Sequence, residues 1–77
     1  MNEIEQLKNL HYKIRQILEE RDYFGLIKFL EVRMFTSNIS ELKTILIITK
    51  PFKDHEDLKH IRQRILDRYE VLKGEKV

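Results

Sequence analysis

Hydrophobic residues recur along this chain with the spacing of amphipathic helices. The first segment, residues 3–20, predicts a helix because its apolar side chains return every three or four positions and form one stripe. That stripe consists of Ile4, Leu7, Leu10, Ile14, Ile17 and Leu18. Asn2 is placed to cap this helix, and Glu3 and Glu5 suit its positively polarised end.

The second predicted helix, residues 22–35, is far more apolar than the first. Its interior has only three polar positions, Lys28, Glu31 and Arg33. A helix that is apolar around most of its circumference is buried on several sides or contacts a partner. Asp22 is the expected N-cap. Gly25 is either a glycine tolerated near a helix start or the point where this helix crosses the first one closely.

The segment TILIIT, residues 44–49, is compatible with two structures. A helix over residues 39–50 would start at a capping box of Asn38 and Glu41 and end before Pro51. It would turn inward Ile39, Leu42, Ile45, Leu46 and Ile48. The β-branched content of TILIIT suits a strand instead, which would give a three-helix arrangement with residues 44–49 extended. Because a lone strand has no partner for its backbone hydrogen bonds, we prefer the helix.

The last predicted helix covers residues 54–73. Asp54 is its expected N-cap, and Glu56 and Asp57 would occupy the first turn. Its predicted buried face consists of Leu58, Ile61, Ile65, Leu66, Tyr69 and Leu72. Residues 74–77 are expected to form a frayed tail.

Together these segments predict one all-α domain over residues 1–77, built of four helices as two antiparallel helical hairpins, because the predicted connections are short. The chain has no cysteine, so disulfides cannot compensate for a small core. The N-terminus lacks the pattern of a signal peptide, and no apolar run approaches the ~20 residues of a membrane span. We therefore expect a cytoplasmic protein without membrane contact.

Catalytic and metal-binding patterns are absent from the sequence. There is no cysteine nucleophile and no glycine-rich loop that would hold a phosphate. The three histidines, His11, His55 and His60, do not have the spacing of three or four that zinc ligands on a helix require. We expect neither an enzyme nor a cofactor, a metal or a small-molecule substrate.

Nucleic-acid binding is the alternative function. Residues 38–73 have the outline of a helix-turn-helix, and the last helix carries basic and amide side chains that could read bases or contact phosphates. These are Lys59, Arg62, Gln63, Arg64 and Arg68. Against it, Asp54, Glu56 and Asp57 would lie where such motifs approach phosphates. Fifteen basic against thirteen acidic residues also leave a net charge of only +2, whereas DNA readers are strongly basic.

Protein binding is the function that the sequence favours. Four short helices hide only their inward faces, and the two middle helices have more apolar side chains than one face holds. Those expected to stay exposed are Phe24, Val32, Phe35 and Ile47. Exposed apolar patches mark interfaces, so we expect a regulatory or interaction module that binds another protein or itself as a homodimer. A third alternative, an inhibitor or immunity factor of phage or plasmid type, is compatible with the length alone.

Overall fold

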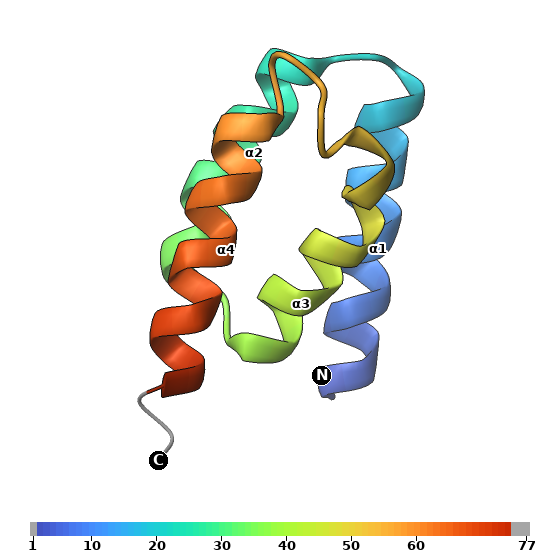
Figure 1. Cartoon of the computed structure of the whole chain (residues 1–77). Helices are drawn as coiled ribbons and strands as arrows, with labels where there is room; N and C mark the ends of the chain where they lie inside the picture. Colours follow the sequence, from blue (N-terminus) through green and yellow to red (C-terminus); the bar gives the residue numbers. More distant parts are fainter. Residues whose placement is uncertain (1, 75–77) are drawn as a thin grey trace.

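The computed structural model describes residues 2–74, which form four α-helices and one short 3₁₀ turn (Figure 1). The helices are α1 (Glu3–Glu19), α2 (Tyr23–Thr36), α3 (Ile39–Ile48) and α4 (Lys59–Gly74), and the turn η1 covers Lys50–Phe52. The all-α prediction is confirmed, and no strand occurs within the described range. The alternative with residues 44–49 extended is wrong, because α3 continues through Ile48.

The predicted N-caps of the first three helices are confirmed. Asn2 and Asp22 each accept a hydrogen bond from the backbone N–H three residues further on, at 2.8 Å and 3.0 Å. At the start of α3, Asn38 Oδ1 accepts from the Glu41 N–H at 2.9 Å, and the Asn38 N–H donates to Glu41 Oε1 at 3.1 Å. This reciprocal pair is a complete capping box.

The junction between α1 and α2 is a Schellman turn. The N–H of Arg21 donates to the carbonyl of Leu18, and the N–H of Asp22 donates to the carbonyl of Ile17. Arg21 adopts φ = 57°, in the left-handed region where glycine is the favoured residue. The turn therefore holds Arg21 in a backbone conformation that is strained for any residue with a Cβ atom.

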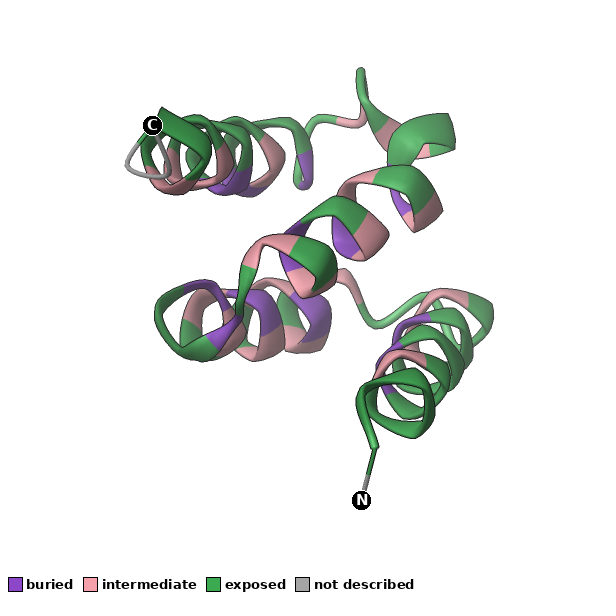
Figure 2. Ribbon diagram, turned by 90° about the horizontal axis from the view of Figure 1, so that it is seen from below, coloured by how far each residue is buried: buried purple, intermediate pink, exposed green. Residues whose placement is uncertain are grey.

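Consecutive helices run in opposite directions, and α3 lies centrally, packed against both α1 and α4 (Figures 1 and 2). The helix α2 packs against α1 and also against α4, with which it runs in the same direction. The two predicted antiparallel hairpins, α1–α2 and α3–α4, therefore pack side by side, with α1 against α3 and α2 against α4.

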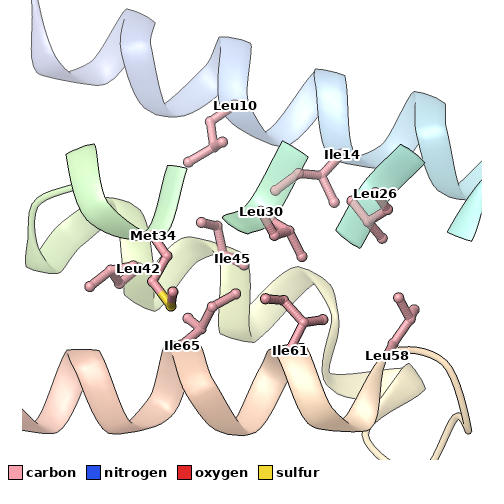
Figure 3. Packing of buried hydrophobic residues seen from close by; sticks show 10 residues of the cluster. All are labelled: Leu10, Ile14, Leu26, Leu30, Met34, Leu42, Ile45, Leu58, Ile61 and Ile65. Carbon is pink, nitrogen blue, oxygen red and sulfur yellow. The ribbon is translucent and has the colours of Figure 1, made fainter. Parts of the chain in front are cut away.

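Ten apolar side chains converge from all four helices and the turn before α4 to form the core (Figure 3). They are Leu10, Ile14, Leu26, Leu30, Met34, Leu42, Ile45, Leu58, Ile61 and Ile65. Two residues that the periodicity placed inside are exposed: Ile4 in the first turn of α1 and, to a smaller degree, Leu66 on α4. Ile4 lies too close to the end of α1 to be covered by the other helices, and Leu66 lies at the edge of the buried face of α4.

The predicted start of the last helix is wrong by five residues. Two turns, at residues 53–54 and 56–58, flank His55, and α4 begins at Lys59, with no acidic residue in its first turn. The preceding turns are held by aromatic packing, because the His55 ring lies 4.4 Å from the Tyr23 ring and 6.1 Å from the Phe52 ring, centroid to centroid. The His55 carbonyl accepts the backbone N–H of Lys59 and so joins these turns to the helix.

Glycine fits position 25 because the N-cap of its own helix occupies the space that a side chain would take. A Cβ added there would overlap the Asp22 carboxylate, which folds back over the first turn of α2. The close crossing with α1 is therefore not the reason for this glycine. At the other end of the chain, Gly74 still belongs to α4, and the rest of the predicted tail lies outside the described residues. Within residues 2–74, no helix combines the length and apolar composition needed to span a membrane.

Candidate interaction surfaces

The outer face of α2 carries three of the large apolar side chains that the structure leaves exposed. Phe24, Val32 and Phe35 are 73%, 67% and 67% exposed, and they lie on the side of the helix opposite the core residues Leu26 and Leu30. In Figure 2, α2 forms a corner of the molecule with exposed residues along its outer side. Lys28 and Glu31 lie between the apolar side chains. We call these five residues, Phe24, Lys28, Glu31, Val32 and Phe35, the α2 outer face.

At its C-terminal end, the α2 outer face continues into a shallow groove of about 300 Å³ between α2 and α4, which lies widely open to solvent. The groove is lined by Met34 and Phe35 of α2 and by Arg64, Asp67, Arg68 and Val71 of α4. Val71 is 51% exposed, and Arg68 Nε is buried without a hydrogen-bond partner among the described residues. The groove therefore offers an apolar floor between two arginine side chains.

Sequence reasoning did not identify Val71 as part of this surface. Val71 follows Arg64 and Asp67 by seven and four residues, so it shares their side of α4, and a helical projection alone places it among polar neighbours. Only the approach of Phe35 from α2 makes it part of an apolar groove.

Ile47 is exposed as expected, at 63%, but it does not join the α2 outer face. It shares the exposed side of α3 with Ser40 and Lys43. Another side of α3 faces α2, where Glu41 Oε2 accepts a hydrogen bond from Arg33 Nη2 at 3.3 Å. The four predicted anchors therefore form two separate surfaces.

The predicted nucleic-acid residues are divided between two sides of α4. Lys59, Arg62 and Gln63 line a small polar cleft toward α3, together with Lys53. Arg64 and Arg68 lie on the side toward α2, in the groove beside Phe35. Arg64 also approaches Glu31 of α2, with 4.0 Å between Nη1 and Oε2. The five residues do not form one continuous stripe.

Arg62 is tied into the fold by two hydrogen bonds to the C-terminal end of α3. Its Nε donates to Thr49 Oγ1 at 2.9 Å, and its Nη2 donates to the Leu46 carbonyl at 3.0 Å. Thr49 is fully buried and donates its own hydroxyl proton to the Ile45 carbonyl at 2.7 Å. Partial burial lowers the pKa of the Arg62 guanidinium through desolvation.

These contacts make Arg62 a cap for α3. The last carbonyls of a helix lack intrahelical partners and carry partial negative charge, which a cation at that end compensates. The Arg62 guanidinium meets both requirements, because it bonds one terminal carbonyl and the buried hydroxyl beside it. Of the predicted base-reading side chains, Arg62 is therefore the one bonded to another helix at its terminus, while Gln63 donates a hydrogen bond to Asp67 Oδ1 at 3.0 Å within α4.

The histidines are not brought together. His55 packs against Tyr23, and its Nδ1 accepts the backbone N–H of Asp57 at 3.1 Å. His11 lies on the outer side of α1 with Tyr12, in a shallow depression formed by that helix alone. Across residues 2–74, no three potential metal ligands of the His, Asp or Glu type are clustered.

A second apolar groove, of about 310 Å³, lies between the C-terminal end of α1 and η1. Leu18, Ile48, Pro51 and Phe52 form its floor, and Arg15 and Glu19 form its rim. Leu18, Ile48 and Phe52 are only partly exposed, and the exposed Pro51 is small. This groove therefore has no projecting anchor of the kind that Phe24 and Phe35 provide on α2.

Known proteins add nothing to this description, because no protein-family model, curated protein or solved structure significantly matches the chain.

Proposed function

We propose that this protein is a non-catalytic interaction module that binds another protein or a second copy of itself through the α2 outer face. The observation that carries the proposal is the exposure of two phenylalanines and a valine along one side of a single helix. Aromatic side chains are enriched in the anchors of protein interfaces, where each buries roughly 150–250 Å². Leaving them in water has a free-energy cost that a partner would remove.

Two further features support the α2 outer face over the other surfaces. It is continuous with the shallow groove beside Phe35, which extends the apolar surface beyond the projecting anchors. Lys28 and Glu31 add charges of both signs between the anchors, which would orient a partner. Ile47 is proposed as a separate and smaller contact on α3.

The test replaces one anchor and one equally exposed aromatic residue elsewhere. Phe35→Asp should abolish complexes that the wild-type protein forms, whereas Tyr12→Asp should leave them intact, because Tyr12 is 71% exposed on the outer side of α1. The complexes are followed by sedimentation velocity of the pure protein and by capture on immobilised protein from extracts of its native cells. Complexes that survive Phe24→Asp, Val32→Asp and Phe35→Asp would contradict the proposal.

Nucleic-acid binding remains the alternative proposal, supported by Lys53, Lys59 and Gln63 around one cleft. It predicts that a labelled mixed-sequence duplex shifts at low salt and is released as salt rises. Charge reversal at Lys59 should then weaken binding, while Phe35→Asp should not. A duplex that stays unbound at low salt would remove this alternative.

A further inference from the structure

The charged and apolar positions of the α2 outer face are arranged symmetrically along the helix. Phe24, Lys28, Glu31 and Phe35 are spaced by four, three and four residues, which places them on one seam of the helix with the spacing of a coiled-coil heptad. Read from either end, this seam begins and ends with phenylalanine and has one charge at each inner position. Its midpoint lies between residues 29 and 30.

A twofold axis through that midpoint would bring apolar side chains together and would pair opposite charges. Two copies of α2 laid antiparallel about it would place Phe24 against Phe35 of the second copy, and Lys28 against Glu31 of the second copy. A parallel pair would instead oppose Lys28 with Lys28 and Glu31 with Glu31. An isologous interface requires this self-complementarity, because each contact is repeated by the symmetry.

The groove beside Phe35 fits the same arrangement. In the antiparallel pair, Phe24 of the second copy would arrive at the C-terminal end of α2, where Phe35 and Val71 give the shallow groove of about 300 Å³ part of its apolar surface. Phe24 is 73% exposed and projects from the opposite end of the same seam. Each copy therefore offers one phenylalanine and one shallow groove, at opposite ends of the same seam.

We infer that the partner of the α2 outer face is a second copy of this chain, bound as an antiparallel α2–α2 homodimer in which Phe24 packs on the partner's shallow groove beside Phe35 and Lys28 pairs with the partner's Glu31. This inference rests on the proposed function and specifies its partner. From Phe24 to Phe35 the seam is only ~16 Å long at 1.5 Å per residue. Because the seam is this short, we expect the pair to bury less than about 1,200 Å², which is typical of weak, reversible association.

Charge exchange at the two inner positions tests the pairing directly. Lys28→Glu gives a seam with two acids and Glu31→Lys a seam with two lysines, so each single variant should weaken self-association at least about tenfold through like-charge repulsion. The double variant Lys28→Glu/Glu31→Lys should regain the wild-type affinity. An equimolar mixture of the two single variants should form a heterodimer, because every inner contact then joins opposite charges.

The measurements are sedimentation velocity runs from about 5 µM to about 500 µM protein, a hundredfold range that detects weak, reversible association. Lys43→Glu on α3 is the matched control and should leave association unchanged, since Lys43 is exposed away from the seam. Circular dichroism of each variant checks that the fold is retained. Lys28 and Lys43 are exposed and the Glu31 side chain is 46% exposed, so the helices should remain intact, although Glu31→Lys also removes the 4.0 Å contact between Glu31 and Arg64.

The outcomes separate the inference from the proposed function. Restoration by the double variant and by the mixture would establish the antiparallel pair. Self-association that Phe35→Asp abolishes but charge exchange does not restore would overturn the pairing and leave the α2 outer face as the interface. A wild-type monomer at every concentration, with a different protein captured through Phe35, would also overturn the homodimer. Complexes that form unchanged when residues of the α2 outer face are replaced would overturn both the homodimer and the proposed function.

Discussion

Removing the Arg62 guanidinium should destabilise this domain more than any other single change to a charged side chain of α4. Arg62→Met keeps the length and apolar stem of the side chain but deletes both hydrogen bonds to α3. Hydrogen bonds from a charged donor contribute roughly 1.5–3 kcal/mol each. Because Arg62 is only partly buried, we expect the lower end, about 3 kcal/mol in total, out of a stability of roughly 4–12 kcal/mol for a chain of this length.

The matched control is Arg64→Met, two residues further along the same helix. The Arg64 side chain is 53% exposed, and its contact with Glu31 spans 4.0 Å, so its loss should cost less than about 1 kcal/mol. Both variants are followed by urea and thermal unfolding with far-UV circular dichroism. A loss of about 3 kcal/mol corresponds to a fall in Tm of roughly 12–24 °C at this size.

A double-mutant cycle with Thr49→Val isolates the contact itself. Since Arg62 Nε and Thr49 Oγ1 bond directly, the two substitutions should be coupled by about 1 kcal/mol or more. Equal losses for Arg62→Met and Arg64→Met, or additive effects in the cycle, would refute the conclusion that Arg62 caps α3.

Three further predictions concern local backbone structure and are measured by the same unfolding experiments. Arg21→Gly should stabilise the protein by about 1 kcal/mol, because φ = 57° strains a side chain there, whereas Arg21→Ala should not, and equal effects would contradict the assignment. Gly25→Ala should fail to deliver the ~1 kcal/mol that alanine normally gains in a helix, since its Cβ displaces the Asp22 cap; a full gain would show that the cap is dispensable. Glu41→Ala should cost about 1–2 kcal/mol and more than Asn38→Gly, because Glu41 serves both the capping box and the ion pair with α2, and the reverse order would contradict this.

The sequence predicts well those features that depend on neighbouring residues. The capping box at Asn38, the N-cap at Asp22 and the exposure of Phe35 follow from short-range spacing, since a helix that is apolar on all sides cannot bury every side among three others. The start of α4 was not predictable in this way. The three acids Asp54, Glu56 and Asp57 resemble a helix N-terminus, but the packing of His55 on Tyr23, 32 residues earlier in the chain, holds this segment in turns.

The candidate surfaces show the same limit. The basic character of α4 is visible in the sequence, but the bond from Arg62 to Leu46, 16 residues away, depends on how α3 and α4 cross. The shallow groove beside Phe35 likewise requires α2 and α4 to lie side by side, which brings Val71 to the same surface. Helical periodicity assigns a side chain to a face, whereas tertiary packing decides what that face meets.

The most direct test of the central claim is site-specific photo-crosslinking in the cells that express the protein. A benzophenone amino acid is placed at Phe35 in one variant and at Tyr12 in another, two aromatic positions of nearly equal exposure, 67% and 71%. The account predicts crosslinked adducts from position 35, of homodimer mass if the α2 seam pairs with itself, and none from position 12. Adducts from position 12 with none from position 35 would contradict the claim that the α2 outer face is the contact surface.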